Sequence, residues 1–149
     1  MSTVVNHVGL ATADLDRAIA FYTAVLDFTE ERRLVLPDDA TAEFLAVERP
    51  VNLEAVYLRR DDFVLELLAF HREGNPSARE RVFNEPGLTH ISFSIDDLDA
   101  AADAVEPNGG AIVRRYPYAV IARDPDGQLI ELLPMSYRTR VDAERERAR

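Results

Sequence analysis

The sequence contains neither lysine nor cysteine, and all seventeen of its basic residues are arginine. Without lysine there can be no Schiff-base or P-loop lysine, and without cysteine there can be no thiol nucleophile and no disulfide framework. No apolar run is long enough to span a membrane, and the chain lacks the basic and apolar blocks of a signal peptide. These absences predict a cytoplasmic protein whose chemistry depends on histidine, carboxylates, hydroxyls or a metal.

Charge and size narrow the class of protein further. The net charge of −10 is unsuited to the phosphates of nucleic acid, and we expect neither a nucleic-acid nor a membrane partner. The 149 residues are 47% hydrophobic, enough to bury the core of one ordinary domain. Residues 135–149 interleave arginines with acids and are expected to form a charged carboxyl-terminal tail or a short helix with spaced ion pairs.

The chain contains an internal repeat. The segments VNHVGLATADLDRAIAFYTAVLD and LTHISFSIDDLDAAADAVEPNGG both read as a strand followed by a capped helix. A shift of 90 − 7 = 83 residues places His7 on His90 and Asp14 on Asp97. One shift that aligns a histidine, a helix cap and an apolar helix face indicates duplication.

A second repeated motif lies downstream, where FVLELL resembles QLIELL. The shift is now 131 − 66 = 65 residues and places Glu66 on Glu131, so the first copy carries 83 − 65 = 18 extra residues. They are expected between residues 37 and 52, as an insert with a short helix that begins near Pro37 and borders the pocket. Glu43 of this insert is expected to face solvent. The side chains expected to face inward are Phe44, Leu45 and Val47.

The pattern predicts an α+β fold made of two βαβββ modules, residues 1–72 and 88–134, joined by a linker at 73–87. Together they are expected to form one domain. The strands are expected at residues 4–12, 29–36, 53–60, 63–70, 88–95, 112–116, 119–123 and 129–133, and the main helices at 14–27 and 97–108.

Four polar residues of these strands predict a metal site. Strand alternation turns His90 and Glu131 away from the helix-covered face, and the repeat places His7 and Glu66 equivalently. A carboxylate among leucines is costly to bury unless it is paired or bound to a metal. Imidazole and carboxylate together suit Zn, Ni, Co, Mn or Fe, so we expect one divalent ion per site. His71 has no repeat partner and is expected at a strand end, outside this set.

These motifs resemble the vicinal oxygen chelate superfamily, the group of glyoxalase I, bleomycin-resistance proteins and extradiol dioxygenases. The matching residues are His7 in VNHVGLAT, Glu66 in VLELL, His90 in GLTHISFSIDDLD and Glu131 in DPDGQLIELLP. The resemblance implies a curved mixed sheet with helices on its convex face, commonly in a homodimer, and the same four metal ligands. It also implies a metal-dependent isomerase or lyase that transfers a proton next to a metal-bound oxygen of a small-molecule substrate. Glu66 or Glu131 would be the catalytic proton-transfer group.

Departures from the family pattern keep other functions open. Two positions that hold glutathione in glyoxalase I are Ala11 and Phe70 here, and neither side chain is polar. Methylmalonyl-CoA epimerase is also similar and uses a glutamate base, for which Glu43 stands at a comparable distance from the first histidine. The alternatives are an Fe(II)-dependent extradiol-type dioxygenase and a non-catalytic resistance or binding protein. Whether the site lies within one chain or across a dimer is left open by the sequence.

Overall fold

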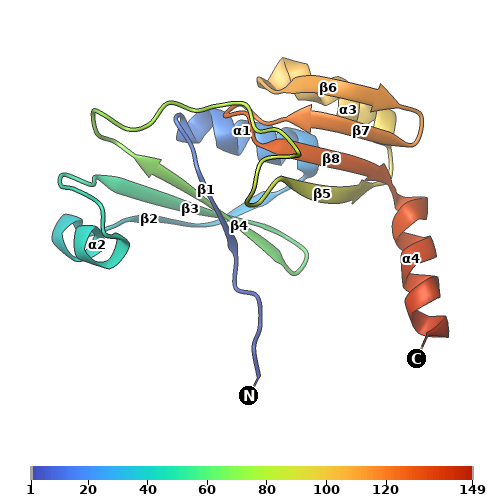
Figure 1. Cartoon of the computed structure of the whole chain (residues 1–149), viewed down its shortest axis with the longest axis horizontal. Helices are drawn as coiled ribbons and strands as arrows, with labels where there is room; N and C mark the ends of the chain where they lie inside the picture. The colour runs from blue at the N-terminus through green and yellow to red at the C-terminus, as the bar shows by residue number, and fades with distance from the viewer. Residues whose placement is uncertain (1, 149) are drawn as a thin grey trace. The chain divides into compact units, whose positions relative to one another are not determined.

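The computed structural model describes residues 2–148, which form two compact units divided between Ala78 and Arg79. Each unit has one four-stranded mixed sheet (Figure 1). The elements of the first unit are β1 (Val8–Ala11), α1 (Leu15–Leu26), β2 (Thr29–Val35), α2 (Asp38–Leu45), β3 (Leu53–Arg60) and β4 (Phe63–Phe70). Those of the second unit are β5 (His90–Ile95), α3 (Leu98–Val105), the 3-10 turn η1 (Glu106–Asn108), β6 (Ala111–Tyr116), β7 (Ala119–Arg123), β8 (Leu129–Pro134) and α4 (Met135–Arg147).

The two sheets have the same topology. Their strand orders are β1-β4-β3-β2 and β5-β8-β7-β6. In each, the first strand runs parallel to the last and the other neighbours are antiparallel. The predicted α+β fold with two βαβββ modules is therefore confirmed. The first strand is shorter than predicted, because only Val8–Ala11 pair with β4 and the residues before them are exposed.

The first helix of each unit begins and is capped in the same way. The side chain of Asp14 accepts a hydrogen bond from the Arg17 backbone N–H at 3.0 Å, and Asp97 accepts from Ala100 at 2.9 Å. Such caps satisfy a backbone donor that has no partner inside the helix. Both the caps and their donors are 83 residues apart (97 − 14 and 100 − 17), which matches the repeat.

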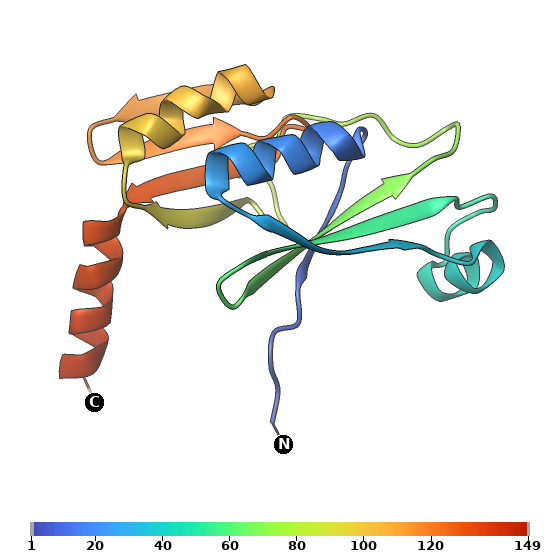
Figure 2. The same ribbon diagram turned by 180° about the vertical axis from the view of Figure 1, so that it is seen from behind.

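The helices α1 and α3 each cover one face of the sheet in their own unit (Figure 2). α1 packs on β4, and its Phe21, Tyr22 and Leu26 are fully buried. α3 packs on β6, β7 and β8, where Val105 is fully buried. Removing each large apolar side chain from water contributes about 1.5–3 kcal/mol, so these faces hold the sheets in place.

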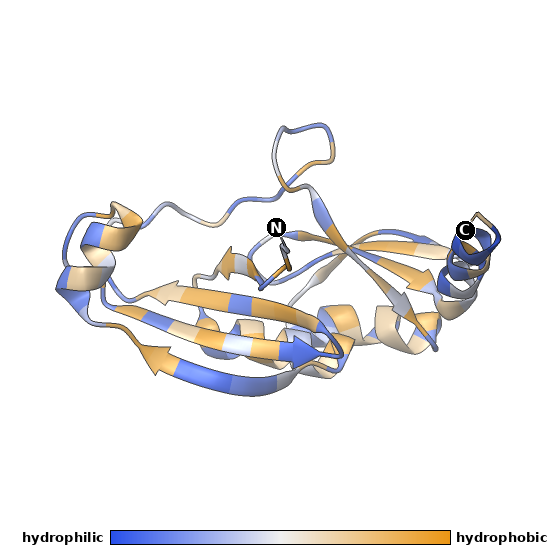
Figure 3. Cartoon of the chain, turned by 90° about the horizontal axis from the view of Figure 1, so that it is seen from below, coloured by the Kyte–Doolittle hydropathy of each residue, from blue (hydrophilic) through white to orange (hydrophobic). Residues whose placement is uncertain are grey.

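Charged residues gather on β2 and α4, which are largely hydrophilic (Figure 3). The predicted charged tail is the helix α4, which continues directly from β8 and contacts β5 and β8. Arg138 and Asp142 form an i,i+4 ion pair on it, with nitrogen and oxygen 2.7 Å apart. No helix among residues 2–148 is both long enough and apolar enough to cross a membrane.

The insert folds as α2 and packs on the first sheet. Ala42 of α2 is buried against Val51 and Leu53, with Leu68 and Phe70 of β4 beside them. Because side chains alternate along a strand, Leu68 and Phe70 share the face of β4 that carries Glu66. The insert therefore covers part of the sheet face on which Glu66 lies.

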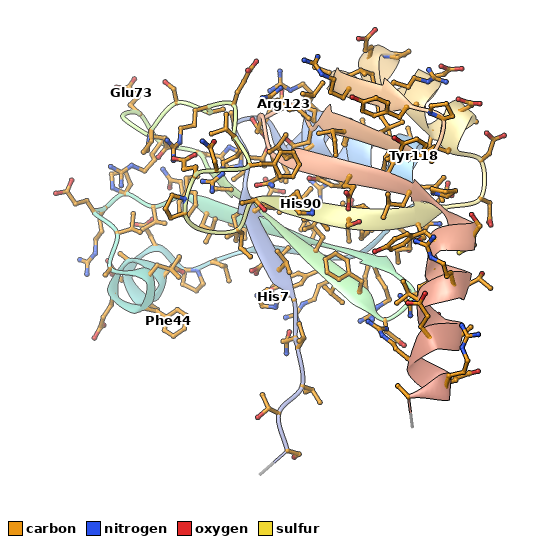
Figure 4. All side chains as sticks on the ribbon, turned by 45° about the vertical axis from the view of Figure 1, so that its right-hand side comes forward. His7, Phe44, Glu73, His90, Tyr118 and Arg123 are labelled. Atoms are coloured by element: carbon orange, nitrogen blue, oxygen red, sulfur yellow. The ribbon has the colours of Figure 1, made fainter. Side chains whose placement is uncertain are left out.

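The prediction that Phe44 and Leu45 face inward is wrong, whereas Val47 is half-buried. Phe44 is 87% exposed and projects from α2 (Figure 4), and Leu45 is 39% exposed. Thr41 and Ala42 are buried instead. Small side chains allow the helix to approach the sheet closely, and Phe44, two residues after Ala42, lies on the opposite side of the helix. Glu43 faces solvent as expected.

Asp38 joins the two ends of the insert. Its Oδ1 accepts hydrogen bonds from the backbone N–H groups of Val51, at 2.6 Å, and Asn52, at 2.9 Å. The hydrogen bond from Asn52 lowers the pKa of the Asp38 carboxyl below its usual value. A carboxyl with a lowered pKa contributes stability above its unfolded-state pKa and loses that contribution as the pH falls through its folded-state pKa.

We expect Asp38→Ala to loosen the insert without unfolding the sheet, because two backbone donors lose their acceptor. Amide hydrogen exchange, read by mass spectrometry, should become faster across residues 38–52. Asp39→Ala is the matched control, since Asp39 is 85% exposed and forms a surface ion pair with the exposed Arg49. Equal exchange in the two variants would show that Asp38 does not hold the insert.

Candidate functional site

In the first unit, His7 and Glu66 form a contacting pair. His7 lies immediately before β1, and Glu66 lies in the middle of β4. The His7 Nε2 is 3.0 Å from the Glu66 Oε2. The other ring nitrogen, Nδ1, is 2.9 Å from the Asn6 Oδ1. Asn6 thus orients the ring and leaves Nε2 directed at the carboxylate.

In the second unit, His90 and Glu131 repeat this arrangement. The His90 Nε2 is 3.7 Å from the Glu131 Oε2, and the His90 Nδ1 is 2.9 Å from the Thr89 Oγ1. Asn6 and Thr89 are separated by 89 − 6 = 83 residues, so the polar partner of each histidine belongs to the repeat as well. Figure 4 labels both histidines, His7 just before β1 and His90 at the start of β5.

Strand register makes the two pairs equivalent. Glu66 lies opposite Gly9 of β1, and Glu131 lies opposite Ser92 of β5. The outer strands match too, because β2 and β6 each contain one irregularity, between Glu30 and Arg32 and between Ile112 and Arg114. The repeat seen in the sequence thus extends to hydrogen-bond register, which places each glutamate at the same point of its sheet.

Each glutamate also accepts a hydrogen bond from a hydroxyl that the sequence analysis missed. Tyr57 of β3 lies opposite Glu66, and its hydroxyl donates to the Glu66 Oε1. The Ser92 hydroxyl donates to the Glu131 Oε2 at 2.6 Å. The hydrogen bond to Glu66, with a further contribution from burial, raises the pKa of Tyr57, so its hydroxyl stays protonated as a donor.

The signal for Tyr57 was present in the sequence. Only Asp61 and Asp62 separate β3 from β4, and a two-residue hairpin loop sets the register of its strands. That register pairs Arg60 with Phe63 and, three residues further along each strand, Tyr57 with Glu66. The position of Ser92 opposite Glu131 depends on the parallel pairing of β5 with β8. These strands are far apart in the sequence, so no short hairpin loop indicates their register.

The two pairs suit a divalent metal in several respects. Both combine an imidazole nitrogen with a carboxylate oxygen, a donor set for Zn, Ni, Co, Mn or Fe. Two ligand atoms that each lie about 2.1 Å from an octahedral metal are roughly 3.0 Å apart, the separation seen between His7 and Glu66. A hydrogen-bonded Nδ1 is also usual for histidines that bind metal through Nε2. The side chains are partly accessible, with His7 34% and Glu66 13% exposed, and His90 32% and Glu131 28%.

Within residues 2–148, no group of three or more His, Cys, Asp or Glu side chains lies close enough together to hold a metal ion. The structure thus brings the four predicted residues together as two pairs, one in each unit. That all four bind one ion stays a prediction.

His71 and Glu43 lie apart from these pairs. His71 follows β4 and is 57% exposed, and its Nε2 is 3.0 Å from the Glu54 Oε2. Glu54 also accepts a hydrogen bond from Arg33 at 3.0 Å. The hydrogen bond from His71 and the neighbouring Arg33 lower the pKa of the Glu54 carboxyl. His71 thus contacts Glu54 at the surface, and Glu43 faces solvent on α2.

A family model decides what this arrangement is. Residues 4–132 match the Glyoxalase/Bleomycin resistance protein/Dioxygenase superfamily. The chain belongs to this superfamily. The match includes His7, Glu66, His90 and Glu131 and spans both βαβββ modules.

Individual proteins of known name agree with this assignment. The chain is 31% identical to lactoylglutathione lyase of Pseudomonas aeruginosa, over 89% of this chain and 83% of that one. It is 27% identical to lactoylglutathione lyase of Schizosaccharomyces pombe, over 91% of this chain, and spans only 49% of that protein's length. The solved structure of the trypanothione-dependent glyoxalase I of Leishmania major has the same fold, with a TM-score of 0.72 at 23% identity, over 99% of this chain and 100% of that one.

Proposed function

We propose that the protein is a metal-dependent lyase or isomerase of the glyoxalase I-like group, acting on a small molecule by proton transfer at a carbon next to an oxygen. The observation that carries this proposal is the duplicated His–Glu pair, His7 with Glu66 and His90 with Glu131, in matching register and with an oriented imidazole in each copy. The relatives named lactoylglutathione lyase support the same class of reaction.

The four residues are proposed as the ligands of one divalent ion. When bound, such an ion supplies positive charge that stabilises an oxygen next to the carbon losing its proton. Asn6 and Thr89 hold the imidazole rings, and Tyr57 and Ser92 hold the carboxylates. This preorganisation reduces the motion that the ligands must undergo.

A glutamate takes and returns the proton. Glu66 accepts the Tyr57 hydroxyl, contacts His7 and is 13% exposed, so several groups hold it in place. Glu131 also accepts the Ser92 hydroxyl, but it is 28% exposed and lies 3.7 Å from His90, so it is held more loosely than Glu66. Because a general base must move between hydrogen-bonding partners, we assign the proton transfer to Glu131 and the more fixed position to Glu66.

Deuterium exchange tests this reaction. α-Hydroxy carbonyl compounds, thiohemiacetals and acyl-CoA thioesters are incubated in deuterated water with the metal-loaded protein, and exchange at the adjacent carbon is followed by NMR. We expect metal-dependent exchange with one of these classes, and a loss of at least about 100-fold in Glu131→Gln, a typical size for removal of a general base.

Glu43→Gln is the control, because Glu43 is an exposed glutamate on α2 and should not affect the rate. Metal content measured in parallel separates loss of the base from loss of the ion. Oxygen consumption with a catechol, and no exchange with any of the three classes, would favour an extradiol-type dioxygenase instead.

We also propose a homodimer, because each sheet leaves its outer strands without a neighbour in its own unit. Light scattering at micromolar concentration should give about twice the chain mass of 16.7 kDa. A stable monomer mass would contradict this proposal.

A further inference from the structure

Arg32 differs from the other arginines of the first sheet. Arg33 pairs with Glu30 and Glu54, Arg59 with Glu31, and Arg60 with Asp27. Among the described residues, Arg32 forms no ion pair and donates no hydrogen bond to a carboxylate. Its one recorded contact is with the ring of Tyr57, whose centroid lies 5.8 Å from the guanidinium carbon.

Its position in the sheet places Arg32 on the face that carries Glu66. Arg32 lies opposite Tyr57, Tyr57 lies opposite Glu66, and Glu66 lies opposite Gly9, which forms one row across the four strands. Residues in one row of a sheet point to the same face. The contacts agree with this, since the Tyr57 ring touches Arg32, His7 and Glu66.

The Arg32 guanidinium thus lies at one end of this row, and Glu66, which contacts His7, lies two strands away with Tyr57 between them. Arg32 and Glu66 are two strand spacings apart, about 10 Å between their backbones. The Arg32 side chain extends to the Tyr57 ring, so a ligand that bridges the guanidinium and Glu66 spans less than this backbone separation. An arginine fork binds a carboxylate through two parallel hydrogen bonds, and stacking on an aromatic ring holds that fork in place.

The rest of this face offers no comparable anion site near Glu66. Ala11 ends β1, and Phe70 packs beneath α2 with Leu53 and Ala42, so neither side chain offers a charge to a ligand. Arg59 is the other arginine whose alternation places it on this face, and Glu31 already occupies it. Of these two arginines, Arg32 is therefore the one that, among the described residues, has no carboxylate partner and is available to a ligand at this face.

We infer that Arg32 binds a carboxylate of the substrate, so that the protein acts on small anionic molecules in which an oxygenated carbon and a carboxylate are separated by a few carbons. This inference rests on the proposed function, because it places the reacting end of the molecule at the His–Glu pairs. Arg32 is here a residue that determines specificity and takes no part in proton transfer.

Binding of hydroxamates to the nickel-loaded protein tests the inference by calorimetry. Hydroxamates bind divalent metals, and the monohydroxamates of succinate, glutarate and adipate carry a carboxylate at three different distances. The corresponding amides have nearly the same shape without the charge. We expect one length of carboxylate to bind about tenfold more tightly than its amide, the contribution of a charge-assisted pair.

Arg32→Gln should bind the carboxylate and the amide equally, while Arg32→Lys should keep part of the preference, since it retains the charge without the planar fork. Arg33→Gln is the matched control. Arg33 is the neighbouring arginine on the opposite face, pairs with Glu30 and Glu54, and should leave the preference unchanged. Nickel content and thermal stability are measured for each variant.

Two results would overturn the inference in distinguishable ways. If the wild-type protein binds carboxylate and amide equally at every length, or if Arg32→Gln keeps the preference, Arg32 is not the anion site and the proposed function stands. If the protein takes up no metal, or binds neither the hydroxamates that carry a carboxylate nor their amide counterparts, the proposed function fails and the inference fails with it.

Discussion

Replacing His90 by alanine should remove most of the bound divalent metal, with an affinity at least about 100-fold weaker than that of the wild-type protein. The reason is the loss of one of the four proposed ligands, and of the group that Thr89 orients toward Glu131. His7→Ala should have an effect of similar size, because Asn6, His7 and Glu66 repeat the arrangement. Elemental analysis after equilibrium dialysis measures the metal content.

His71→Ala is the control for this experiment. His71 is the one histidine of the sequence outside the proposed ligand set, contacts Glu54 at the surface, and its replacement should leave the metal content unchanged. Thr89→Val should weaken binding by about 10–100-fold, as expected when a histidine loses the hydrogen bond that orients it. Full metal content in His90→Ala would refute the ligand assignment.

Gly127→Ala should lower the free energy of unfolding by about 3 kcal/mol, the sum of left-handed backbone strain and a steric clash. Gly127 has a φ of +89°, and a Cβ at this position would lie 2.6 Å from the Arg79 carbonyl oxygen. That oxygen belongs to backbone, which cannot swing away as the end of a side chain can. Thermal unfolding should show a decrease in Tm of roughly 6–12 °C.

Gly127 closes the turn that leads into β8, so the same substitution should also disturb Glu131. The Asp124 side chain accepts hydrogen bonds from the backbone N–H groups of Asp126 and Gln128, both at 2.9 Å. The Arg81 N–H donates to the Gly127 carbonyl at 3.0 Å, which ties the preceding segment to this turn.

Gly74→Ala provides the comparison for Gly127→Ala. Gly74 also has a positive φ, +78°, but a Cβ there would meet no atom within 4 Å. Only the backbone strain remains, so we expect a loss of about 1 kcal/mol. Equal losses in the two variants would show that the contact with Arg79 is unimportant.

Local pattern was enough to predict most of the elements. The bounds of β3, β4 and β7 agree with the sequence prediction to the residue, because each is a short apolar strand that ends at a turn or a charged residue. The helix caps Asp14 and Asp97 were recognisable for the same reason, since a cap acts on backbone only three residues away.

The sequence prediction failed where the outcome depended on packing between distant segments. Phe44 was expected to face the protein because it is apolar, yet Ala42 is the residue that contacts the sheet. Which side of a short helix is buried depends on how closely its partner can approach. That distance is set by Leu53 and Phe70, which belong to other strands.

The amino-acid sequence by itself determined the duplication, the two histidines and the two glutamates, since a repeat is visible wherever local patterns recur at a constant shift. Only the tertiary structure decided what these residues touch. The contacts of Tyr57 with Glu66, of Ser92 with Glu131 and of Arg32 with Tyr57 all cross from one strand to another. A side chain has a cross-strand neighbour only once strand register is established, and that register depends on long-range pairing that local propensity does not encode.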